Sequence, residues 1–134
     1  MPAKDRYHDA VVHSLEKSGW RVIRENVVVG DEVRQLYIDI LARRDSQQMI
    51  LVEVKTFEDM QSPMTYLEKA IGQYMVYLAV LDFVGNNTPL YLAVSSDAYQ
   101  TLFAETMVQH IIRHLKVKIV VFDPVKEEII QWLT

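Results

Sequence analysis

The sequence predicts an α/β fold in which a mixed β-sheet is flanked by helices, as an α-β-β-β-α-β core followed by a further helix and two strands. Two observations predict this arrangement. Short β-branched runs indicate strands, and longer runs with apolar residues at helical spacing lie between some of them. Strands joined by short turns must pair antiparallel, whereas a strand that returns after a helix is usually parallel, so the sheet should be mixed.

The first half of the chain predicts one helix and three strands. Tyr7, Val11 and Leu15 recur close to helical spacing, and Gly19 stops the run, which predicts a helix over residues 4–18. Turn residues then separate three β-branched runs. The strands are expected over residues 20–29, 34–43 and 48–56.

The second half predicts two helical stretches and three strands. Pro63 suits the first turn of a long helix, and the run 85–89, which contains Gly and Pro, ends it. Ser96 or Asp97 is the expected N-cap of the next helical stretch. The expected elements are a helix over 64–83, a strand over 90–95, a helical stretch to about 115, and strands over 117–122 and 128–133.

The composition indicates one globular domain over residues 1–134. Half of the residues are hydrophobic and 24% are charged, and the absence of cysteine excludes disulfides, thiolate metal sites and a cysteine nucleophile. The polar N-terminus and the lack of any apolar run of about 20 residues predict a cytoplasmic protein that does not enter a membrane. The net charge of −4 argues against a module that binds DNA by general electrostatics, so any DNA contact needs a local basic patch, a metal or a partner.

Charged residues interrupt two apolar strands, where a charge is unfavourable. Asp39 lies within residues 36–41, and Glu53 and Lys55 lie within residues 50–55. Because side chains alternate along a strand, Glu53 and Lys55 share one face. On their own these two residues are better explained by a solvated ion pair, which contributes little to stability.

The length of the hairpin loop decides whether Asp39 joins them. Directly opposed residues of an antiparallel pair point to the same face. A three-residue loop closed by Arg44 and Gln48 would oppose Asp39 to Glu53, whereas a two-residue loop would oppose Asp39 to Val52. We expect the three-residue loop if the two carboxylates form a site.

Two clustered carboxylates repel each other unless a cation lies between them or one is protonated. Oxygen-rich sites of this kind suit Mg²⁺ or Mn²⁺, which also bind phosphate oxygens. Lys55 could orient a water molecule, accept its proton or stabilise the developing charge. These parts suit hydrolysis of a phosphodiester.

The spacing of Asp39, thirteen intervening residues and then Glu53-Val54-Lys55 resembles the signature of PD-(D/E)xK nucleases, which have a restriction-endonuclease-like fold. The residue before Asp39 is Ile38 and not the Pro of the signature. The resemblance implies that Asp39, Glu53 and the Val54 carbonyl bind the metal and that Lys55 acts on the water.

Two helices extend this resemblance. Gln73 and Tyr77 look like the QxxxY motif of the RecB-like branch, which implies that Gln73 positions metal or substrate, while Tyr77 is expected to pack in the core. Related enzymes often place a Glu on the first helix as an extra metal ligand. Here that helix offers Asp5, His8 and Asp9 instead, and His8 is our choice of ligand.

Over the whole chain the sequence resembles the XisH family, the cyanobacterial fdxN-element excision controlling factors. The residues that carry the resemblance are 3–9, 37–39, 52–55, 72–74 and 123–132. It implies a role, with a partner of the XisI family, in excision of a DNA element by a separate recombinase. Two hypotheses follow: a metal-dependent phosphodiesterase-like domain acting on DNA, and a non-catalytic regulatory subunit that binds a XisI-type partner. A homodimer is compatible with either.

Overall fold

The computed structural model describes residues 6–45, 47–57 and 62–134, and these form a six-stranded sheet in the order β1-β2-β3-β4-β5-β6. The pairs β3–β4 and β4–β5 are parallel, and the other three pairs are antiparallel. The predicted mixed sheet and the predicted order of helices and strands are therefore confirmed.

The first half of the chain forms the expected helix and three strands. They are α1 (His8–Lys17), β1 (Arg21–Gly30), β2 (Gln35–Arg44) and β3 (Gln48–Val54). The predicted start of the first helix at residue 4 lies outside the described residues.

The second half begins with α2, in which Pro63 occupies the first turn as expected. The elements are α2 (Pro63–Phe83), β4 (Leu90–Ser95), α3 (Ser96–Gln100), a 3₁₀ turn (Leu102–Ala104), α4 (Thr106–His114), β5 (Ile119–Asp123) and β6 (Glu128–Leu133). The N-cap of α3 is Ser95, whose Oγ accepts from the N–H of Ala98 at 3.2 Å. The prediction of Ser96 or Asp97 was wrong because the helix begins directly where β4 ends.

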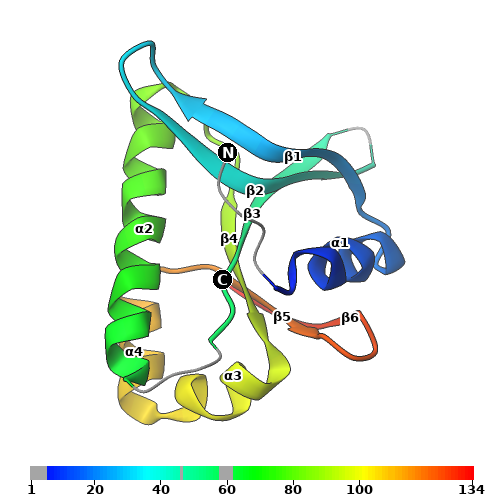
Figure 1. Ribbon diagram of the computed structural model, residues 1–134, viewed down its shortest axis with the longest axis vertical. Coiled ribbons are helices and arrows are strands. Elements are labelled where there is room, and N and C mark those ends of the chain that lie inside the picture. The colour runs from blue at the N-terminus through cyan, green and yellow to red at the C-terminus, as the bar shows by residue number, and fades with distance from the viewer. Residues whose placement is uncertain (1–5, 46, 58–61) are drawn as a thin grey trace.

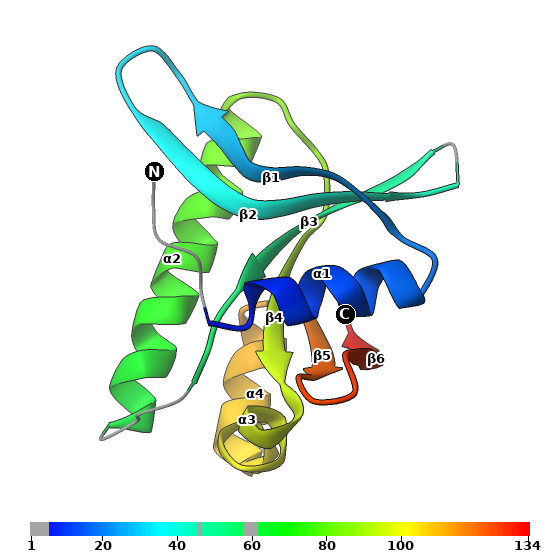
Figure 2. The same cartoon turned by 45° about the vertical axis from the view of Figure 1, so that its right-hand side comes forward.

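Helices cover both faces of the sheet, as Figures 1 and 2 show. On one face, Val11 and Leu15 of α1 pack into an apolar core with Ile40 and Val52 of the sheet. On the other face, α2, α3 and α4 pack into a larger core. Of the helices that the structure describes, none has the length and apolar character needed to cross a bilayer.

The long β1–β2 hairpin depends on one glycine. Gly30 has a φ of +126°, and a Cβ at this position would collide with the carbonyl oxygen of Arg34. Asp31 stabilises the turn, because its Oδ1 accepts from the N–H groups of Val33 and Arg34 at 2.9 and 2.8 Å. This hairpin extends β2 well beyond its pairing with β3, and the candidate site lies where those two strands separate.

Candidate metal and phosphodiester site

The register of β2 and β3 brings Asp39 and Glu53 together. Arg44 pairs with Gln48, so the connecting loop has three residues, and the ladder continues to the pair of Ile40 and Val52. One step further along this register, Asp39 lies opposite Glu53. The predicted loop length and the predicted shared face are therefore confirmed.

Each carboxylate binds the backbone of the opposite strand. The N–H of Asp39 donates to Glu53 Oε1 at 3.2 Å, and the N–H of Val54 donates to Asp39 Oδ2 at 2.8 Å. Because the two strands separate here, their N–H groups cannot reach the opposite carbonyls, and a buried N–H without a partner is unfavourable. The carboxylates replace those carbonyls and are held in place by two strands.

Glu53 lies in an environment that opposes its ionisation. Glu53 is only 5% exposed to solvent. Burial, followed by the negative charge of Asp39, raises the pKa of Glu53 to about 8, while the ammonium of Lys55 acts in the opposite direction. Lys55 Nζ lies 3.8 Å from Glu53 Oε2. At neutral pH, Glu53 therefore keeps its proton unless a further positive charge approaches.

This donor set fits a divalent cation. The hydrogen bonds to backbone N–H groups use Asp39 Oδ2 and Glu53 Oε1, which leaves Asp39 Oδ1 and Glu53 Oε2 for other ligands. In an extended strand the N–H and C=O of one residue point to the same side, so the Val54 carbonyl also points toward Asp39. Hard oxygen donors of this kind are what Mg²⁺ and Mn²⁺ prefer, and a cation bound here would also favour the ionised form of Glu53.

Gln73 and Tyr77 of α2 form a hydrogen-bonded chain beside the carboxylates. Tyr77 donates its hydroxyl proton to the Tyr37 carbonyl at 2.9 Å, so its oxygen accepts from Gln73 Nε2 at 3.0 Å. This orients the amide, and Gln73 Oε1 is left as a buried acceptor with no hydrogen-bond partner in the described part of the chain. Burial, and then the charges of Glu53 and Asp39, raise the pKa of Tyr77 to about 12, so its hydroxyl remains a donor.

Gln73 also borders a hollow beside the end of β3. This hollow of about 310 Å³ is lined by Lys55, Tyr66, Lys69, Ala70 and Gln73. It opens between the last residues after β3 and the first three turns of α2. Four of the predicted site residues, Asp39, Glu53, Lys55 and Gln73, are thus brought to one region of the molecule.

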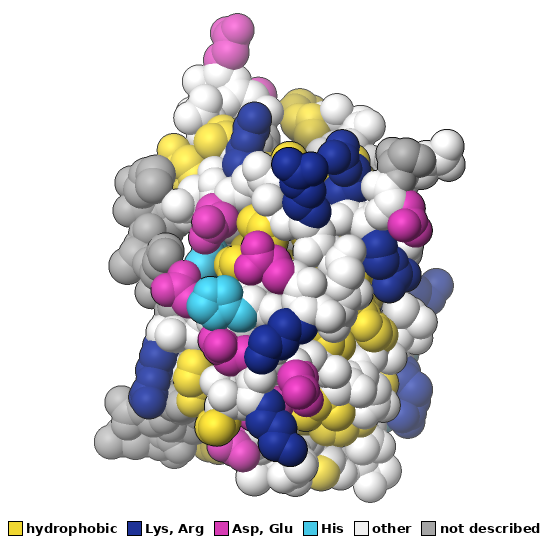
Figure 3. All heavy atoms as spheres, turned by 90° about the vertical axis from the view of Figure 1, so that its right-hand side faces the viewer, with side chains coloured by type: hydrophobic (Ala, Val, Ile, Leu, Met, Phe, Trp, Pro, Cys, Tyr) yellow, Lys and Arg dark blue, Asp and Glu magenta, His cyan; other side chains and the backbone are white. Residues whose placement is uncertain are grey.

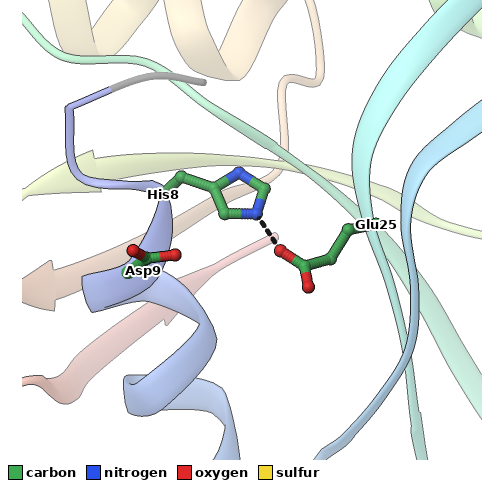
Figure 4. Close-up of side chains that lie close together, drawn as sticks. All are labelled: His8, Asp9 and Glu25. Atoms are coloured by element: carbon green, nitrogen blue, oxygen red, sulfur yellow. Dashed lines mark hydrogen bonds and ion pairs between the residues drawn. The ribbon is translucent and has the colours of Figure 1, made fainter. Parts of the chain in front are cut away.

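His8 belongs to a second group of possible ligands, shown in Figure 4. Its Nε2 lies 2.5 Å from Glu25 Oε1 of β1, and ligand atoms of His8, Asp9 and Glu25 all lie within 4.8 Å of one another. Among the described residues, no hydrogen bond or ion pair joins His8 to Asp39 or Glu53. The role of His8 as a metal ligand stays a prediction, and Asp5 lies outside the described residues.

Sequence reasoning missed two of these residues. Tyr77 was interpreted as a packing residue; it is buried as expected, but it also orients Gln73, and the QxxxY spacing was the available signal. Glu25 was not singled out from the sequence. No local pattern connects it to His8, because the two lie 17 residues apart and meet only through the fold.

Comparison with known proteins places the chain in a family. The family model described as "XisH protein" matches residues 1–130. A solved XisH family protein from Nostoc punctiforme PCC 73102 is 31% identical, with a TM-score of 0.88, covering 97% of this chain and 100% of that one. A solved fdxN element excision controlling factor protein from Anabaena variabilis is 33% identical, with a TM-score of 0.89, covering 98% and 100%. A search of curated proteins found no match.

Proposed function

We propose a function for this chain that starts from its membership of the XisH family, to which it belongs. In this proposal the chain is an excision controlling factor whose Asp39–Glu53 site binds a divalent metal. The site then hydrolyses phosphodiesters in DNA. The observation that carries the proposal is the pair of carboxylates held on separating strands, with Glu53 buried and short of positive charge. An ordinary surface ion pair would not require such a buried carboxylate.

Each residue has a distinct role in this proposal. Asp39, Glu53 and the Val54 carbonyl hold the cation, which when bound supplies a Lewis acid for water and for phosphate oxygens. Lys55, beside Glu53, stabilises the negative charge that develops on the phosphate. The unpaired Gln73 Oε1 accepts a hydrogen bond from water or substrate and so orients it.

The test is calorimetric titration of Mg²⁺ and Mn²⁺ into the wild type, Glu53→Ala and Asp39→Ala. We expect binding in the wild type and its loss in both variants, with unchanged circular dichroism. Cleavage of duplex and branched DNA should be lost in the same two variants. Wild-type protein that binds no metal at millimolar concentrations would refute the proposal.

A second candidate function is a regulatory subunit that binds a XisI-type partner and controls a recombinase without cleaving DNA. The observation that favours it is the outer face of α2 and the residue after it, where Met75, Val76, Phe83 and Val84 are 37%, 53%, 75% and 42% exposed. Clustered exposed apolar side chains often mark a protein interface. The net charge of −4 also favours a protein partner over free DNA.

Substitution on this face separates the two candidates. Phe83→Ser should abolish capture of a XisI-type protein, whereas Glu53→Ala should leave that capture intact. Sedimentation of the chain alone reports whether a second copy covers the same face instead. Partner binding that needs Phe83, together with no cleavage under any metal, would favour the regulatory subunit.

A further inference from the structure

The hollow beside Lys55 has the features of an anion site that the metal-binding residues do not explain. Its two ammonium groups come from different elements, Lys55 after β3 and Lys69 on α2, and none of the described residues that line it is a carboxylate. Glu53 lies 3.8 Å from Lys55 and partly neutralises that charge, so Lys69 carries most of the unbalanced positive charge.

Lys69 is the second cationic residue at the hollow. It is exposed, and no ion pair or hydrogen bond joins its ammonium group to any other residue that the structure describes. It lies one helical turn before Gln73, so both side chains project from the same side of α2 toward the hollow. A lysine on the rim of a hollow, without a polar partner among the described residues, is available for a ligand.

The size and lining of the hollow favour one unit of a nucleic-acid backbone. Its volume of about 310 Å³ is at the lower end of the range for ligand pockets, which suits a single nucleotide better than a larger ligand. The lining offers two cationic donors and the side chain of Tyr66. Lysine binds phosphate as a point charge. It does not need the planar, bidentate geometry with which arginine binds phosphate or carboxylate.

The charges elsewhere fit this location. On the face that carries α1, acidic and basic side chains are interspersed, as Figure 3 shows, so that face lacks a continuous basic surface. Arg44 at the hairpin stacks over the Trp20 ring at 4.7 Å and donates to Gln48 at 3.1 Å, so its guanidinium is already engaged. A backbone that enters the hollow meets the ammonium groups of Lys55 and Lys69 next to the carboxylates.

We infer that Lys69 is a substrate-binding residue that contacts a DNA backbone phosphate in the hollow, next to the phosphodiester held at Asp39 and Glu53. The inference rests on the proposed function, since Lys69 would bind the phosphate next to the phosphodiester that the metal site hydrolyses. It names a binding group outside the metal-binding set, so the two can be tested separately.

The experiment measures binding of a fluorescent 20-base-pair duplex by anisotropy at several salt concentrations, with Ca²⁺ in place of Mg²⁺ to prevent cleavage. The variants are Lys69→Met and, as a matched control, Lys126→Met, which removes one exposed lysine from the turn beside α1. Loss of one phosphate contact should reduce the slope of log affinity against log salt by about 0.9. The ratio of wild-type to Lys69→Met affinity should therefore change about 3.5-fold between 50 and 200 mM salt.

The outcomes separate the two proposals. Lys69→Met should weaken binding and reduce the slope, while Lys126→Met matches the wild type and all three proteins bind Mn²⁺ equally. Equal affinity and slope for Lys69→Met and wild type would overturn the inference, and Mn²⁺ binding that depends on Glu53 would still support the metal site. A wild type that binds no duplex would overturn the inference together with the DNA-directed part of the proposed function.

Discussion

Replacing Glu53 by Gln tests the central feature of the site, a buried carboxylate without enough positive charge. The folded-state pKa of about 8 lies above the ordinary 4.5. The folded protein therefore holds more protons than the unfolded chain between these values. The contribution of Glu53 to stability is fully present below about pH 4.5 and is lost as the pH rises through about 8.

The size of this loss follows from the shift. At about 1.4 kcal/mol per pKa unit, ionising Glu53 in the metal-free protein lowers the free energy of unfolding by on the order of a few kcal/mol. Gln cannot ionise, but its side-chain oxygen can still accept from the N–H of Asp39. Glu53→Gln should thus match the wild type near pH 4 and exceed its stability by a few kcal/mol near pH 8.5.

Urea unfolding in EDTA at these two pH values measures the difference directly. Comparing wild type and variant at each pH cancels the titration of the other groups. Asp39→Asn is the control, because removing the neighbouring charge should lower the pKa of Glu53 and flatten the pH dependence in part. Identical pH dependence in wild type and Glu53→Gln would refute the reasoning.

Magnesium provides the second arm of the same experiment. A cation that binds only the folded state stabilises it by about 2.7 kcal/mol at a hundred times its Kd. Near pH 8.5, Mg²⁺ should restore the stability of the wild type and leave Glu53→Gln unchanged. Equal stabilisation of both proteins would place the metal elsewhere.

Two paired substitutions test the site and the fold separately. Tyr77→Phe should destabilise the chain by about 1–3 kcal/mol, because the Tyr37 carbonyl loses its hydrogen bond. It should also weaken Mn²⁺ binding, measured by calorimetry, because Gln73 becomes free to rotate. Tyr74→Phe also leaves a carbonyl unpaired, so similar destabilisation with unchanged Mn²⁺ affinity is expected. Gly30→Ala should destabilise by more than about 1 kcal/mol in urea unfolding, because its Cβ meets a backbone carbonyl at positive φ. Gly72→Ala, in the open middle of α2, should instead stabilise by about 0.5–1 kcal/mol, and equal effects of the two glycine changes would contradict this account.

The sequence by itself determined the elements and reduced the register of the carboxylate pair to a choice between two loop lengths, of which the structure has the three-residue one. Short turns require antiparallel strands, and a three-residue loop between Arg44 and Gln48 can only oppose residues of one parity, so Asp39 and Glu53 meet. These are local constraints of chain geometry. They follow from neighbouring residues and need no knowledge of distant contacts.

Tertiary structure decided which distant side chains complete the site. His8 turns to Glu25, and Tyr77 reaches a carbonyl 40 residues away and so orients Gln73. Lys69 reaches the rim of the hollow because α2 packs beside the end of β3. Hydrophobic packing of helices on the sheet sets these distances. Because hydrophobic attraction is non-directional, a local sequence pattern does not predict which distant side chains it brings together.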